Sequence, residues 1–201
     1  MGTETVTTPG AVLRQMPERS FVRNSDLPGS SAARRNALSH AAIDGDLIRV
    51  RNGLYYKGVK SRFGMTRPSS QEVAREVLGV EGVGPVGFSA ARFLGLTTQV
   101  PAETHLSFLG PIPEGIDGVR IHKRNNARRR SLNESEIALL EVLRDPKTLV
   151  EGGWDALLEV ARREFSNGSM RWTALLESVD GEGPLATRTN FARLREDLVT
   201  A

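Results

Sequence analysis

Arginine side chains dominate two neighbouring stretches near the start of this chain, and arginine both reads bases and neutralises phosphates in nucleic acids. The stretch SSAARRNALSHAAI, residues 30–43, places Arg34 and Arg35 side by side in a helical pattern. A guanidinium group can bond the O6 and N7 atoms of guanine in a bidentate way. The stretch RVRNGLYYKG, residues 49–58, contains three more cations around an Asn-Gly turn. A basic helix beside a basic hairpin favours a nucleic-acid interface.

The candidate DNA contacts share a polar or cationic side chain and a place on this helix or hairpin. They are Ser31, Arg34, Arg35, Asn36, Ser39 and His40 in the helix, and Arg49, Arg51, Asn52 and Lys57 in the hairpin.

The elements that position these residues follow from local patterns. Ser30 or Ser31 can cap the helix, and alanines with Leu38 form its apolar face, while Gly45 can end it in a left-handed conformation. Residues 47–51 alternate as a strand with one wet face, and Asn52–Gly53 predicts a type I′ turn into a return strand from Leu54. Of the two tyrosines that follow, we expect Tyr55 to be the outward or half-exposed one and the other to face the core.

The upstream segment completes the pattern. Ala11 to Met16, opened by Pro9, predicts a first helix, and residues 21–27 predict a short strand or turn leading into one helical turn. This order is the layout of a winged helix-turn-helix, in which the second main helix enters the major groove of DNA and the hairpin contacts the backbone or the minor groove. The alternative is that the same fold serves as a protein-interaction module.

Composition narrows the classes of function. The chain has 201 residues, of which 39% are hydrophobic and 25% charged, and it contains no cysteine. The absence of cysteine excludes disulfides, thiolate zinc sites and cysteine nucleophiles, and it suits a cytoplasmic location. No stretch approaches the roughly 20 apolar residues of a membrane span. We expect residues 1–9 to be a disordered leader.

The net charge of +3 is unevenly distributed along the chain. Residues 1–67 carry +6, residues 68–130 carry +2, and residues 131–201 carry −5. A basic front and an acidic back suggest two partners of opposite charge, although such scatter also arises by chance on soluble surfaces.

The middle segment shows no chemistry of its own. GVGPVG, residues 82–87, fits a dinucleotide-binding glycine pattern, but a helix at 71–78 precedes it where a strand is needed, so we expect it to connect two helices, the second at 88–94. Strands at 104–109 and 119–123 predict a small α+β unit. His105 and His122 have no carboxylate spaced to share a metal, and no catalytic constellation is present. We therefore expect no enzyme activity, cofactor or metal.

The basic run RIHKRNNARRR, residues 120–130, holds six cations. It reads either as a solvated hinge or as a second phosphate-binding patch. After it, Ser131 and Glu134 predict a capping box. Apolar stripes then predict further helices at 153–165, at about 170–179 after a Ser169 cap, and at 187–199.

Two stretches resemble a known family. ALSHAAIDGDLIRVRNGLYYKG and FSAARFLGLTTQVPAETHLSFLGP look like the antitoxins of the AbiEi family, from bacterial type IV toxin–antitoxin systems, and related transcriptional regulators. The family pattern joins a winged helix ending in G-L-Y to an A-x-x-L-G-L-[ST]-T-Q-V-P-A segment, and this chain has both. The likeness covers about residues 10–125. It implies a DNA-binding repressor of its own operon, encoded beside a nucleotidyltransferase-like toxin.

These observations predict an α+β protein with an N-terminal winged helix-turn-helix, a small α+β unit and a mostly helical C-terminal region. The predicted domains are residues 10–60 for DNA binding and residues 68–201 for the antitoxin or regulatory part, itself divided into 68–125 and 131–201. The expected partner is double-stranded operator DNA, and a nucleotidyltransferase toxin is the second. Direct toxin contact, a homodimer or cooperative binding on DNA, and a plain regulator without toxin-directed activity all stay open.

Overall fold

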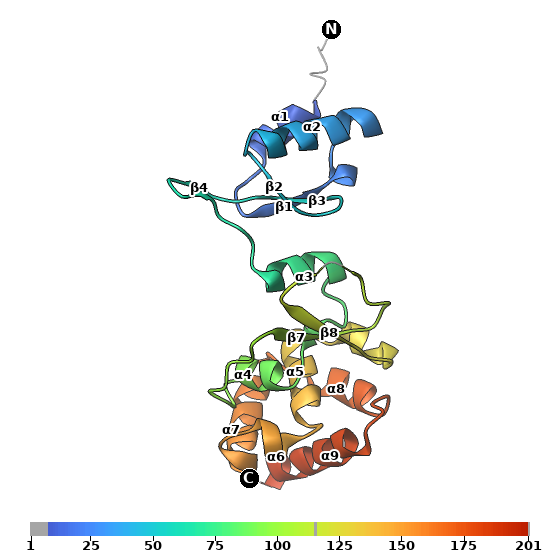
Figure 1. Ribbon diagram of the computed structural model, residues 1–201. Helices are drawn as coiled ribbons and strands as arrows, with labels where there is room; N and C mark the ends of the chain where they lie inside the picture. Colours follow the sequence, from blue (N-terminus) through green and yellow to red (C-terminus); the bar gives the residue numbers. More distant parts are fainter. Residues whose placement is uncertain (1–7, 115, 201) are drawn as a thin grey trace. The chain divides into compact units, whose positions relative to one another are not determined.

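The computed structural model describes residues 8–114 and 116–200, so most of the leader predicted at 1–9 lies outside the described residues. The fold is of the α+β class, with helices and small sheets distributed along the chain (Figure 1). The chain divides into two compact units, unit 1 up to Glu76 and unit 2 from Val77 onward. The boundary falls inside helix α3 (Ser70–Leu78), later than the break predicted between residues 60 and 68.

Unit 1 begins with α1 (Pro9–Gln15), whose N-terminus is capped by the side chain of Thr8. Strand β1 (Ser20–Arg23), the single turn η1 (Asn24–Asp26) and helix α2 (Ser31–Ile43) follow. Strands β2 (Ile48–Arg51) and β3 (Leu54–Lys57) then form a hairpin. β3 lies between β1 and β2 in an antiparallel three-stranded sheet.

The core of unit 1 lies between this sheet and the two helices. Its buried side chains are those of Leu13, Val22, Leu27, Leu38 and Leu47. Tyr55 is half-buried, as expected, but it is the tyrosine that packs against this core. Tyr56 is buried on the other face of the sheet, where its ring lies 4.9 Å from that of Phe21, so the expectation that it faces the core is wrong. Because Leu38 comes from the middle of α2 and is only 1% exposed, it fixes which face of α2 is left to solvent.

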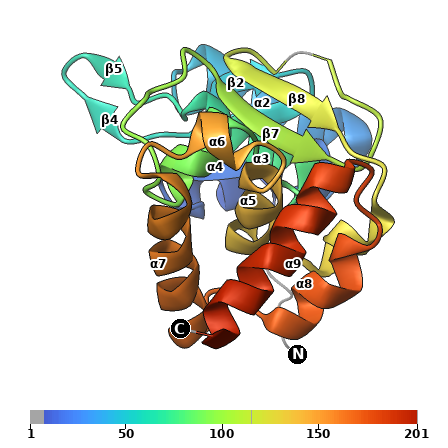
Figure 2. The same cartoon turned by 90° about the horizontal axis from the view of Figure 1, so that it is seen from below.

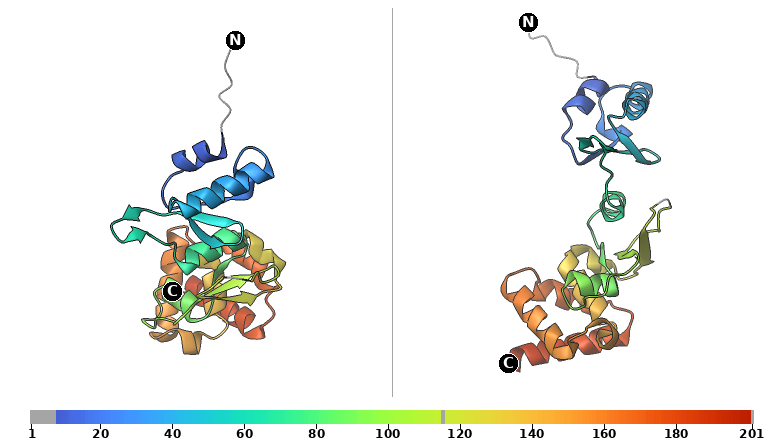
Figure 3. Two further views of the ribbon diagram at one scale, coloured as in Figure 1. Left: turned by 45° about the horizontal axis from the view of Figure 1, so that its top comes forward. Right: turned by 60° about the vertical axis from the view of Figure 1, so that its left-hand side comes forward.

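A second, smaller hairpin was not predicted. Strands β4 (Lys60–Ser61) and β5 (Gly64–Met65) pair antiparallel at the boundary between the two domains that the sequence predicted. The hairpin projects from the body of unit 1, as Figure 3 shows from two directions.

Unit 2 combines a small sheet with a helical core. Strands β6 (Gly84–Pro85), β7 (Thr104–Phe108) and β8 (Val119–Lys123) form the sheet in that order, with β7 and β8 parallel. The glycine-rich run connects α3 to α4, as predicted, and two of its residues also form an edge strand of this sheet. Close packing explains why residue 84 is a glycine, since a Cβ atom at this position would lie 2.6 Å from the side chain of Ile137.

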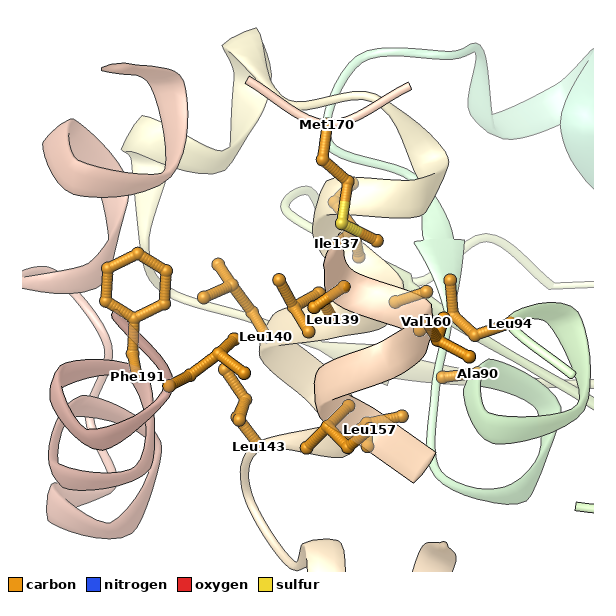
Figure 4. Packing of buried hydrophobic residues seen from close by; sticks show 14 of the residues in the cluster. Ala90, Leu94, Ile137, Leu139, Leu140, Leu143, Leu157, Val160, Met170 and Phe191 are labelled. Atoms are coloured by element: carbon orange, nitrogen blue, oxygen red, sulfur yellow. The ribbon is translucent and has the colours of Figure 1, made fainter. Parts of the chain in front are cut away.

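The helices of unit 2 surround one central helix. Helix α4 (Phe88–Phe93) and the turn η2 (Ala127–Ser131) precede α5 (Glu134–Val142), which is followed by α6 (Pro146–Leu149), α7 (Gly153–Ser166), α8 (Trp172–Val179) and α9 (Leu185–Thr200). Figure 2 shows α7, α8 and α9 around α5. Residues 137–140 of α5 are fully buried, and Figure 4 shows Leu140 among side chains that include Leu143, Leu157 and Phe191.

Two cap predictions in unit 2 are wrong. The capping box of α5 uses Asn133 and Glu136 instead of Ser131 and Glu134, because residues 127–131 form the separate turn η2. Helix α8 begins after Arg171, whose side chain makes no cap bond, so Ser169 does not cap it.

Candidate nucleic-acid interface

Helix α2 presents one polar face to solvent. Ser30 caps the helix by accepting a hydrogen bond from the backbone N–H of Ala33. Leu38 and the half-buried alanines 37 and 41 occupy the packed side. The other candidates of the helix are exposed: Ser31, Arg35, Asn36, Ser39 and His40. Arg35, Asn36, Ser39 and His40 are spaced three and four residues apart, so they lie on neighbouring turns along one side of the helix.

Arg34 differs from Arg35 in its surroundings. Its side chain is half-buried, and its Nε atom is buried without a hydrogen-bond partner in the part of the chain that the structure describes. A helix rotates by about 100° per residue, so the two adjacent arginines point in different directions, and only Arg35 is exposed. Arg35 therefore has the better geometry for reading bases, and Arg34 lies at the edge of the packed side.

The β2–β3 hairpin carries three of the remaining candidates near its turn. Arg49 is exposed, and its Nη2 atom donates a hydrogen bond of 3.1 Å to the side-chain oxygen of Asn52, which fixes the two side chains together. Arg51 is half-buried. The pairing shifts between Arg49 and Arg51, so the hairpin contains a bulge.

The turn itself differs from the prediction. Gly53 has a φ of 75°, but Asn52 is not among the residues with positive φ, so a type I′ turn is wrong. A left-handed glycine combined with a bulge is another common way to close a short hairpin. The hairpin is confirmed, and it still presents Arg49 and Asn52 to solvent.

Lys57, which the sequence selected as a DNA contact, instead bonds the end of helix α1. Its Nζ atom donates hydrogen bonds to the carbonyl oxygens of Leu13, Arg14 and Met16, at 3.0, 3.0 and 2.7 Å. An ammonium group has three protons, so these bonds use all of them. The carbonyl groups at the end of α1 lack partners within the helix, and Lys57 satisfies them. Lys57 is therefore a structural residue, and it leaves the set of DNA contacts.

Two of the six cations in the basic run at residues 120–130, Arg124 and Arg129, bond carboxylates inside the fold, whereas the other four are exposed. Arg129 is fully buried, and its guanidinium group bonds both carboxylate oxygens of Glu182 at 2.6 and 2.7 Å and one of Glu141 at 2.5 Å. Arg124 also bonds Glu141, at 2.7 and 2.8 Å. These arginines join η2 to helix α5 and to the loop before α9.

The arginines of this cluster lower the pKa of the carboxylate that they share. Burial alone would raise the pKa of Glu141, but hydrogen bonds from Arg124 and the charge of Arg129 outweigh it and hold that pKa below its ordinary value of 4.5. The pKa of Glu136 is lowered in the same way, because bonds from Arg171 and Asn133 outweigh its burial. Three acidic residues of the C-terminal region, Glu136, Glu141 and Glu182, are thus buried and paired, which reduces the acidity of the surface.

The two strand histidines lie together. His122 Nε2 is 3.2 Å from His105 Nδ1, and burial and the nearby charge of Arg124 lower the pKa of His122. Within residues 8–114 and 116–200, no cluster of three or more metal-ligating side chains occurs. No helix in these same ranges is long and apolar enough to cross a membrane.

Comparison with known proteins gives one informative likeness. The chain matches no model of a known protein family, and no curated protein matches it. Among solved structures it is similar to the RV2827C protein from Mycobacterium tuberculosis, with a TM-score of 0.51 and 14% sequence identity. The likeness covers 94% of this chain and 74% of that one. At this identity the likeness shows that the two chains share a fold.

Proposed function

We propose that unit 1 is a winged helix-turn-helix domain that binds operator DNA, and that the chain is an antitoxin of the AbiEi type that represses its own operon. The order α1, β1, η1, α2, β2 and β3 supports the domain assignment. In this assignment α2 is the recognition helix and the β2–β3 hairpin is the wing.

The observation that carries the proposal is the exposed face of α2. Arg35, Asn36 and Ser39 are free of the core, and no acidic residue occurs between Ser30 and Ile43. Asn and Arg are the side chains that pair best with adenine and guanine edges in the major groove. A protein-interaction module would have no need for a face that combines base-reading side chains with an absence of negative charge.

The experiment compares the two adjacent arginines of α2. The full chain is titrated onto a duplex of the DNA upstream of its own coding sequence and onto a random duplex of equal length. We expect Arg35→Ala to weaken binding to the upstream duplex about 10- to 100-fold more than to the random one, the equivalent of a lost bidentate base contact. Arg34→Ala is the matched control, and it should change both affinities by a similar factor. Equal losses for Arg35→Ala on both duplexes would reduce that residue to a phosphate contact.

A second function, a plain autoregulator without toxin-directed activity, shares the same DNA site. The burial of three carboxylates in unit 2 favours it, because the acidic surface available to a basic toxin is smaller than the sequence indicates. Co-expression with a nucleotidyltransferase encoded next to this gene separates the two. Growth rescue by a variant that no longer binds the promoter supports the antitoxin, and rescue that always follows promoter binding supports the regulator.

A further inference from the structure

The β4–β5 hairpin has a tip that is held in one conformation. The hydroxyl of Ser61 donates a hydrogen bond of 2.8 Å to the carbonyl oxygen of Gly64 and accepts one of 3.2 Å from the N–H of Phe63. Gly64 has a φ of 102°, a conformation that other residues rarely adopt. The tip therefore presents Arg62 and Phe63 from a closed four-residue turn.

The base of the hairpin is fixed to the rest of unit 1. The backbone N–H of Thr66 donates a hydrogen bond of 3.0 Å to the carbonyl oxygen of Val59, and the Thr66 hydroxyl oxygen accepts one of 2.9 Å from the N–H of Val59. A Cβ atom at Gly58 would lie 2.0 Å from the carbonyl oxygen of Thr66, so only glycine fits there. Lys60 Nζ lies 2.5 Å from a carboxylate oxygen of Asp46, in the loop that follows α2. These contacts hold the hairpin next to the C-terminal end of α2.

The chemistry of the tip is unusual for a surface loop. Phe63 is 86% exposed, and the guanidinium carbon of Arg62 lies 4.6 Å from the centre of its ring. The segment from Lys57 to Arg67 contains four cations and no acidic residue. The tip therefore combines an exposed aromatic ring, an arginine stacked on it and a basic segment around both. Such a tip complements a surface that is anionic and can also pack against apolar groups. The minor groove of DNA has both properties, since it is lined by sugars and base edges between two rows of phosphates.

We propose that the β4–β5 hairpin inserts its Arg62–Phe63 tip into the minor groove next to the site that α2 occupies. This inference rests on the proposed DNA-binding function of unit 1. Arg62 lies in the groove, and Phe63 packs against sugars or against the edge of a base step.

The test uses the full chain and two duplexes of its own upstream DNA. One duplex contains the footprint of the protein with about ten base pairs on each side, and the other is trimmed to the contacts of α2 and the wing. Phe63→Ala should weaken binding to the long duplex roughly tenfold and leave its salt dependence unchanged, because it removes a contact without a charge. Arg62→Ala should weaken binding similarly and lower the salt slope by about one unit. On the trimmed duplex both variants should bind like the wild type.

The matched control is Phe93→Ala, which removes an exposed phenylalanine in unit 2. It should bind both duplexes like the wild type, and thermal unfolding should show that all three variants are folded. Wild-type protein that binds neither duplex overturns the proposed function and this inference with it. Wild-type protein that binds the long duplex while Phe63→Ala binds equally well overturns the hairpin contact alone. A change from dimer to monomer in Phe63→Ala, with unchanged DNA binding, would assign the tip to self-association and also refute the proposal.

Discussion

Replacing Arg129 by methionine tests whether the buried ion pairs support unit 2. The guanidinium group of Arg129 is fully buried and bonds Glu182 through two hydrogen bonds and Glu141 through one. After the substitution Glu141 keeps both bonds from Arg124, whereas Glu182, which is 2% exposed, keeps one hydrogen bond from Asn126 and a longer ion pair of 3.8 Å with Arg144. The structural cost therefore falls mainly on a single carboxylate.

Removing one partner of a buried pair costs about 3–5 kcal/mol, because the other charge stays buried without compensation. Methionine fills much of the arginine volume, so loss of packing adds little. For a unit of this size, about 4 °C of melting temperature corresponds to each kcal/mol, so we expect a fall of roughly 10–20 °C in the unfolding of unit 2.

Differential scanning calorimetry of the full chain measures this fall. The control is Arg128→Met, the same substitution one residue earlier, where the exposed side chain donates one hydrogen bond, to the carbonyl of Glu177. It should cost less than about 1 kcal/mol. The double variant Arg129→Met with Glu182→Gln should recover part of the stability, since it removes the orphaned charge. Equal effects of the Arg128 and Arg129 substitutions, or no recovery in the double variant, would refute the reasoning.

The remaining predictions concern the wing, acid and the division of the chain. Arg51→Ala should weaken binding to all duplexes about equally and lower the salt slope by about one unit, as a mobility-shift titration at several salt concentrations would show. Because the pKa values of Glu136 and Glu141 are lowered by folding, their contribution to stability is complete above about pH 4.5 and is lost as the pH falls below it, which acid titration of the near-ultraviolet circular dichroism should detect. Residues 1–76 alone should bind DNA weakly but fail to rescue growth against the toxin, whereas residues 77–201 should rescue at least partly; rescue by residues 1–76 would place neutralisation in repression of transcription.

Local patterns in the sequence were enough to place the elements of unit 1 up to the end of the β2–β3 hairpin. Helix α2 with its Ser30 cap and the β2–β3 hairpin agree with the pattern of polar and apolar residues. These features depend on periodicity and capping, which act over a few residues. The same patterns placed the strands at 104–108 and 119–123 and the long helices of unit 2 to within a few residues.

The tertiary structure decided the role of several cations. Lys57 and Arg129 look like free positive charges in the sequence, but each one bonds oxygen atoms contributed by segments more than 40 residues away. The hairpin that presents Phe63 is likewise stabilised by Thr66 and by an ion pair with Asp46, and its sequence shows only a basic linker. Charge alone cannot distinguish a phosphate contact from a structural bond, because the difference lies in which acceptors the fold brings within hydrogen-bond distance.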